Sequence, residues 1–236
     1  MGHCRVVIAE FSIIMTNVVI AADYLKVPSS GAKASIDFVN GIYTVNGVTQ
    51  TAAQVVNLTG RITPGSGLSI ISGSPCQLLN SLLALILTAN WTMVIEANLT
   101  DNTASLGLRM FLLTVFDAGF NDQIAIYTLG ELLLSFASAV IFEDSGVTTR
   151  EADGNLSVGV GIHKVAATRT NAEVALSMDG ESPVSNATVI NISSWTFPPS
   201  QVQVADGNNS PHAGGFIRKI TIYDPVSDTQ LPILSA

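Results

Sequence analysis

The residues of this sequence that could carry out acid–base, nucleophilic or metal chemistry are few and widely separated. The three histidines are His3, His163 and His212, and nothing in their spacing assembles a metal triad or a Ser-His-Asp site. Hydrolysis of a glycosidic bond needs two carboxyl groups. Glu96 is the only carboxylate in segment 91–99, and the chain has no Glu-x-Asp-x-Glu motif. We therefore predict no catalytic residues and no enzymatic activity.

Asp and Asn gather in short polar clusters that offer the oxygen ligands Ca²⁺ prefers. Such residues are also the usual residues of tight turns, and we favour that interpretation for each cluster. We therefore predict no metal and no cofactor. The clusters are Asp101-Asn102, Asp117, Asn121-Asp122 and segment 206–209.

The chain has only two tryptophans for stacking against a ligand. Trp91 lies in an alternating apolar segment, which predicts a core position. Trp195 lies between Ser193-Ser194 and Phe197-Pro198-Pro199, a sequence typical of an exposed loop, so it is the better candidate for contact with a ligand. Together with Asp206 and Asn208 of the polar 206–209 loop, it forms the candidate ligand-binding set.

The composition excludes two classes of partner. The 236 residues are 47% hydrophobic and 12% charged, with 10 Lys plus Arg and a formal net charge of −8. A chain without a basic stripe lacks the counterion release on which nucleic-acid affinity depends, and an acidic chain is not attracted to an anionic membrane. So few charges also indicate either a large buried core or a surface that partners cover.

Two cysteines, Cys4 and Cys76, are too far apart in sequence for a metal-ligand pair of the usual spacing. We favour two reduced thiols. An interchain disulfide through Cys4 remains an alternative.

Alternating apolar residues and turn signals predict an all-β fold of two packed antiparallel sheets. Two Asn-Gly pairs, 40–41 and 46–47, predict a small meander at a sheet edge. In the last strand the alternation places Phe216, Arg218, Ile220 and Ile222 on one face and Ile217, Lys219, Thr221 and Tyr223 on the other. Segment 61–73 is a predicted loop, and segment 76–87 a short buried helix. The predicted strands are 35–39, 42–45, 91–99, 108–116, 123–129, 132–142, 155–161, 162–169, 173–178 and 216–223.

Residues 1–34 form a predicted N-terminal arm before a single sandwich domain over residues 35–236. The apolar run 5–22 contains Glu10 and Asn17, so it suits neither a signal peptide nor a membrane span. We interpret it as one or two strands or an assembly arm.

Three elements near the end of the chain resemble the concanavalin A-like lectin and laminin-G superfamily. They are His163-Lys-Val-Ala-Ala167, Met178-Asp-Gly180 and Gly214-Gly-Phe-Ile-Arg-Lys-Ile-Thr-Ile-Tyr223, in that order. The whole chain, including the opening 35–43 and the tail 223–236, also resembles domains of bacteriophage virion proteins. The resemblance implies a concanavalin A-like jelly roll in a tail, collar, fibre or capsid-surface protein.

The leading hypothesis at this point is a non-enzymatic structural component of a phage particle. Its arm would join the protein to copies of itself and to other virion proteins, with strand addition as one mode of docking. The alternative is a carbohydrate-binding module for a host-surface glycan, and a degenerate glycosidase is a third, weaker possibility.

Overall fold

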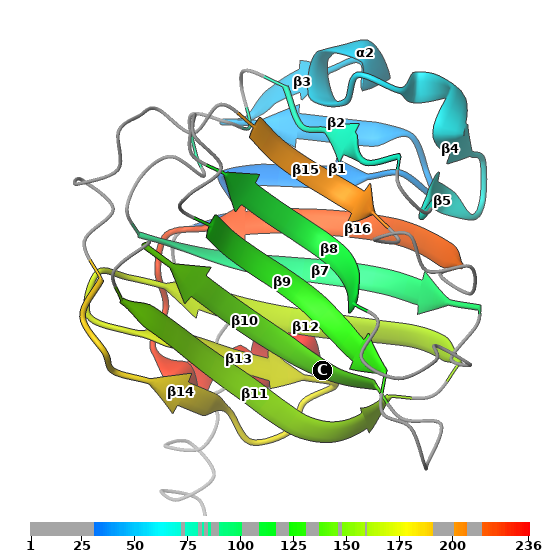
Figure 1. Ribbon diagram of the computed structural model, residues 1–236. Coiled ribbons are helices and arrows are strands. Elements are labelled where there is room, and N and C mark those ends of the chain that lie inside the picture. The colour runs from blue at the N-terminus through cyan, green and yellow to red at the C-terminus, as the bar shows by residue number, and fades with distance from the viewer. Residues whose placement is uncertain are drawn as a thin grey trace, which may run out of the picture.

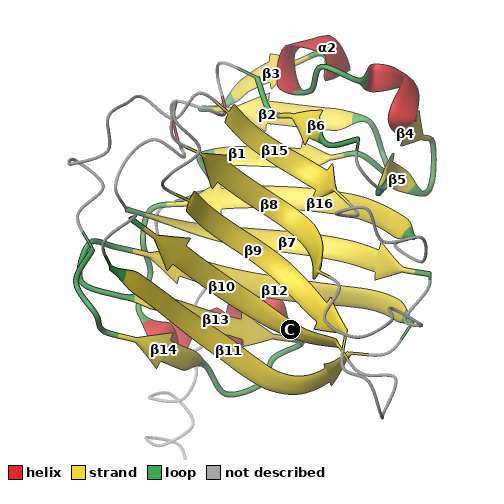
Figure 2. Ribbon diagram, viewed as in Figure 1, coloured by secondary structure: helices red, strands yellow, loops and turns green. Residues whose placement is uncertain are grey.

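Two antiparallel sheets packed face to face make up the body of the protein. The computed structural model describes residues 31–71, 74–79, 82, 85, 90–100, 109–116, 123–130, 137–145, 148–158, 160–190, 201–206 and 214–236. Figure 1 shows one sheet in front of the other, and Figure 2 shows that few of the described residues are helical. The predicted β-sandwich is therefore confirmed.

The rear sheet in Figure 1 has ten strands, in the order β14-β13-β12-β7-β16-β1-β2-β3, with β5 pairing with β16 and β4 pairing with β5. Their bounds are β1 (Ala34–Asp37), β2 (Ile42–Val45), β3 (Val48–Gln50), β4 (Ile62–Thr63), β5 (Gly67–Ser69), β7 (Trp91–Leu99), β12 (Gly161–Arg169), β13 (Val174–Met178), β14 (Val184–Asn186) and β16 (Gly215–Tyr223).

The front sheet has six strands, in the order β11-β10-β9-β8-β15-β6. Their bounds are β6 (Cys76–Gln77), β8 (Arg109–Phe116), β9 (Gln123–Gly130), β10 (Ala137–Asp144), β11 (Thr149–Val158) and β15 (Gln201–Asp206).

One hydrophobic core fills the space between the sheets. Alternate residues of β7, from Trp91 to Leu99, face this core, as the alternation predicted. Ile124 and Ile126 of β9 face it from the other sheet. The Cys76 side chain is also buried there, and burial raises the pKa of its thiol although the charge of Arg61 opposes the shift.

The predicted meander is confirmed at one edge of the ten-stranded sheet. β1, β2 and β3 follow one another there. Asn46 and Gly47 both have positive φ, of 50° and 75°, as the tight turn between β2 and β3 requires.

The predicted faces of β16 are correct from Lys219 onward and wrong before it. The register between β16 and β7 shifts between Ile217 and Lys219, so Arg218 is the extra residue of a β-bulge. A bulge reverses the alternation, because two residues then oppose one on the neighbouring strand. Ile217, with no exposed area, therefore takes the core position that the alternation gave to Phe216.

Three predicted boundaries need correction. The predicted loop 61–73 contains the short strands β4 and β5. The predicted helix 76–87 starts with β6 instead, and of its later residues Leu82 and Leu85 are described and helical. The strand predicted at 155–161 is β11, which begins at Thr149. The polar residues at its start pair with β10, and there Arg150 forms a buried salt bridge with Glu143.

The described helices are short. They are α2 (Ala52–Val55), η1 (Thr59–Arg61), η3 (Asp228–Gln230) and α4 (Leu231–Ser235). Within the described part of the chain, no helix is long and apolar enough to cross a membrane. Residues 1–30 of the predicted arm and the predicted strand segment 132–136 lie outside the described residues, and Ala34 already belongs to β1.

Candidate functional site

The residues proposed from sequence for ligand contact are not brought together among the described residues. Trp195 and Asn208 lie outside them, and Asp206 is the last residue of β15. The proposed set therefore stays a prediction. Trp91 is 1% exposed, which confirms its core position. His163 lies 2.7 Å, through Nδ1, from Asp179 Oδ2, and no potential metal-binding cluster occurs among the described residues.

A hollow of about 230 Å³ lies on the ten-stranded sheet, on the face turned away from the core. Strands β12, β7 and β16 form its floor, and α4 forms one wall. We call it the outer hollow. Its lining residues are Val94, Glu96, Lys164, Lys219, Thr221, Tyr223 and Leu234.

The strand register places these side chains in rows across the sheet. Glu96 of β7 is directly opposite Lys164 on one side and Lys219 on the other. In the next row Val94 stands opposite Thr221. Directly opposed side chains of an antiparallel pair have Cβ atoms about 5 Å apart, so each row is in contact range.

The charged row is held by the β-bulge. Arg218 donates from Nε to Glu96 Oε1 over 2.7 Å, and both side chains are less than a quarter exposed. The bulge puts Arg218 and Lys219 on the same side as Glu96, whereas a regular strand would send Arg218 to the core. Lys164 donates from Nζ to the backbone oxygen of Ala236.

Beyond Lys219, the next strand carries Asp37. Burial alone would raise the pKa of the Asp37 carboxyl, but hydrogen bonds from the Asn40 side chain and backbone and the charge of Lys219 hold it below its ordinary value. The Asp37 oxygens accept from Asn40 N and Nδ2 over 2.9 and 2.8 Å. Asp37 therefore influences Lys219 through charge alone.

β16 lines the hollow with polar groups that have no hydrogen-bond partner among the described residues. Lys219, Thr221 and Tyr223 alternate along the strand and so share one face. Among the described residues, none of their side chains forms a hydrogen bond or salt bridge. Burial raises the pKa of Tyr223, so its phenol stays protonated and able to donate. These three residues were assigned to one face from the alternation, but nothing in the sequence indicated the hollow around them.

The C-terminal segment builds the wall of the hollow by packing against the same sheet face (Figure 1). Leu231 and Leu234 of α4 contact Val94, Ala166 and Ala175 in a small second apolar cluster. Ser235 Oγ lies 2.9 Å from Ser177 Oγ and accepts from Gly180 N over 3.0 Å.

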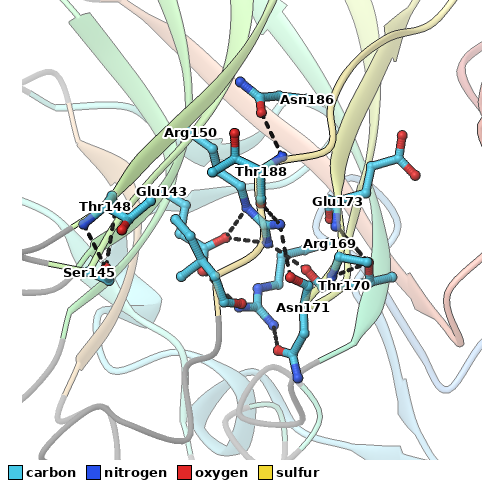
Figure 3. Close-up of polar contacts among 12 residues, drawn as sticks. Glu143, Ser145, Thr148, Arg150, Arg169, Thr170, Asn171, Glu173, Asn186 and Thr188 are labelled. Atoms are coloured by element: carbon cyan, nitrogen blue, oxygen red, sulfur yellow. Dashed lines mark hydrogen bonds and ion pairs between the residues drawn. The ribbon is translucent and has the colours of Figure 1, made fainter.

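A buried ionic bridge joins the two sheets at one end of the sandwich (Figure 3). Glu143 of β10 accepts from Arg150 of β11 through Nε and Nη2, over 2.8 and 2.6 Å. Its other oxygen accepts from Arg169 Nη2 of β12, over 2.7 Å. All three side chains have no exposed area. We call this set the inter-sheet bridge; its side chains are inaccessible to a ligand, and it attaches the six-stranded sheet to the ten-stranded sheet that carries the outer hollow.

Backbone carbonyls complete the bridge. Arg150 Nη1 donates to Thr188 O and Asn171 O, over 2.8 and 3.3 Å (Figure 3). Burial lowers the pKa of Arg150, and the charge of Glu143 opposes that shift. A guanidinium, with five donors, suits a site with so many fixed acceptors.

The sequence matches no protein-family model and no curated protein. Solved structures do match. The CBM40 domain of the Ruminococcus gnavus IT-sialidase, bound to α2,3 sialyllactose, is 19% identical with a TM-score of 0.53, covering 73% of this chain and 100% of that one.

Two further structures have a similar fold. Domain 4 of AbnA, a GH43 arabinanase from Geobacillus stearothermophilus in complex with arabinotriose, is 14% identical with a TM-score of 0.56, covering 88% of this chain and 99% of that one. The binding domain of botulinum neurotoxin DC in complex with SialylT is 11% identical with a TM-score of 0.51, and the match covers 70% of this chain and 40% of that one.

The chain has the β-sandwich fold of these domains. At such identities the similarity establishes the fold alone. It confirms the predicted lectin-like sandwich. None of the three similar structures is of a virus particle, so the virion assignment stays a prediction.

Proposed function

We propose that this chain is a carbohydrate-binding module that holds a saccharide in the outer hollow. The observation that carries the proposal is the row Lys219, Thr221 and Tyr223, whose polar ends line a hollow without partners among the described residues. Polar groups that the protein leaves unsatisfied in a concave site are the groups that a ligand can satisfy. The sugar complexes of two similar sandwich domains support the same conclusion.

The lining suits a sugar ring in its chemistry and its size. Thr221 and Tyr223 offer hydroxyls to ring hydroxyls, while Val94 and Leu234 offer apolar contact to ring C–H groups. A volume of about 230 Å³ is below the roughly 300–1,000 Å³ of sites for drug-sized ligands. We therefore expect one terminal sugar residue to enter the hollow.

The proposal is for binding without hydrolysis. Glu96 is the one carboxylate among the described residues that line the outer hollow, and Arg218 Nε lies 2.7 Å from its Oε1. Glycoside hydrolysis uses two carboxyl groups flanking the bond. A single, already paired carboxylate suits orientation of a hydroxyl.

Binding of a panel of neutral and acidic oligosaccharides, measured by isothermal titration calorimetry, tests the proposal. The double variant Thr221→Val/Tyr223→Phe removes two hydroxyls and should weaken binding about 5- to 150-fold, as expected for two neutral hydrogen bonds. Thr44→Val is the matched control, because Thr44 lies in the row of Thr221 but outside the hollow. Absence of binding to every saccharide, or unchanged affinity of the double variant, would refute the proposal.

The structural role in a phage virion remains a second prediction. It depends on residues 1–34 as an assembly arm, most of which lie outside the described residues. The similar structures favour the glycan-binding alternative.

A further inference from the structure

Positive charge is concentrated at the outer hollow of this acidic protein. The chain has 10 Lys plus Arg and a net charge of −8. Three of those cations, Lys164, Arg218 and Lys219, surround the single carboxylate Glu96. Among the described residues that line the hollow, two lysines therefore lie beside one carboxylate.

The charges around Glu96 do not balance. Arg218 already holds the Glu96 carboxylate through a direct hydrogen bond. Lys164 donates to the Ala236 backbone oxygen. Lys219 has neither a hydrogen bond nor a salt bridge among the described residues, and the oxygens of the nearby Asp37 are held by Asn40. The Lys219 ammonium is thus the cation of the hollow that a ligand can pair with.

We propose that the outer hollow selects an anionic saccharide, whose acidic group pairs with Lys219 and is supported by Lys164. This inference rests on the proposed function. A partly buried ammonium strengthens a hydrogen bond to an anion, since such charge-assisted bonds are about twice as strong as neutral ones. The Arg218–Glu96 pair contributes no net charge, so among the described residues the charges of Lys164 and Lys219 exceed that of Asp37, the carboxylate opposite Lys219.

The spacing along β16 fits a single acidic sugar. Lys219 and Thr221 are two residues apart on one strand face, which separates them by roughly 7 Å. That distance suits an acidic substituent at Lys219 and a ring hydroxyl at Thr221. Tyr223 continues the row and borders the apolar side near Leu234.

Titration calorimetry with matched oligosaccharides tests the inference on the full chain. The probes are 3′-sialyllactose, a glucuronic-acid disaccharide, 3′-sulfated lactose and neutral lactose. We expect at least one anionic probe to bind about tenfold or more tightly than lactose, and raising the salt concentration should weaken that binding. Comparison of the sulfated probe with the two carboxylated probes shows which acidic group the lysines prefer.

Lys219→Gln should weaken binding of the anionic probe by about tenfold or more, and should weaken lactose binding by a much smaller factor, because Lys219 lines the hollow for either ligand but pairs its charge only with an anion. Lys33→Gln is the matched control, because it removes the same charge outside the hollow. Lys33 directly precedes β1 and forms a surface salt bridge with Asp224. Its substitution should change affinity less than twofold.

The outcomes separate the two proposals. If lactose binds as tightly as every anionic probe, or if Lys219→Gln and Lys33→Gln behave alike, the acidic-ligand inference is overturned while glycan binding stands. If no saccharide binds at all, the proposed function fails and the inference fails with it.

Discussion

Glu143 is the residue on which the attachment between the two sheets depends most directly. Its two oxygens accept hydrogen bonds from arginines of different strands, one in each sheet, and none of the three side chains has exposed area. A buried ion pair is not in itself a strong source of stability, because desolvation offsets the attraction. Losing one partner is costly, since the other charges then stay buried without compensation.

We therefore expect Glu143→Gln to lower the free energy of unfolding by about 3–5 kcal/mol. The amide keeps the size of the side chain but removes the carboxylate that both Arg150 and Arg169 contact directly. Denaturant unfolding followed by circular dichroism measures the change. Glu181→Gln, the same substitution at an exposed position, should stay within about 0.5 kcal/mol. Equal effects of the two substitutions would show that the inter-sheet bridge adds nothing to stability.

Individual residues show where alternation along the sequence predicts the structure correctly and where it fails. Alternation identified the core face of β7 correctly, because every second residue from Trp91 is apolar and the strand is regular. It failed at Arg218, where a bulge shifts the register without a signal in the local pattern. The inter-sheet bridge was missed because Glu143, Arg150 and Arg169 lie on three strands and look like surface charges.

At the scale of elements, the C-terminal segment decides the shape of the outer hollow. No helix or strand is predicted from sequence for residues 224–236. The structure forms η3 and α4 there and packs Leu231 and Leu234 against Val94 and Ala166. A helix of five residues is not stable by itself, so its form depends on the sheet beneath it. The sequence therefore predicted the shared face of Lys219, Thr221 and Tyr223 on β16, but not the helix α4 that forms the wall of the hollow.

We expect Leu231→Ala to lower the free energy of unfolding by about 2–4 kcal/mol, because Leu231 has no exposed area and its loss leaves a cavity over the sheet. Displacing α4 also moves Leu234 from the hollow, so saccharide affinity should fall although Leu231 does not line it. Ile233→Ala on the same helix is the control, at about 1 kcal/mol or less, since Ile233 belongs to neither apolar cluster. Unchanged affinity for the Leu231 variant would mean that the wall is dispensable for binding.

At the scale of the whole molecule, the described residues of the two sheets share the large core between them and the inter-sheet bridge, while the ten-stranded sheet alone packs the smaller cluster under α4. We expect the sandwich to unfold as one cooperative unit. Native-state hydrogen exchange tests this, because the slowest amides of β7, central in one sheet, and β9, central in the other, should open with the same free energy.

Hydrogen exchange of the Glu143→Gln variant tests more directly whether the two sheets unfold together. If the sheets form one cooperative unit, the substitution in the six-stranded sheet must lower the opening free energy of β7 and β9 equally. A loss confined to β9 would show that the ten-stranded sheet is stable alone. In that case the outer hollow, built only on β7, β12, β16 and α4, would not depend on the bridge, and saccharide affinity should survive conditions that open the six-stranded sheet. Cooperative unfolding predicts the opposite, a hollow that is lost together with both sheets.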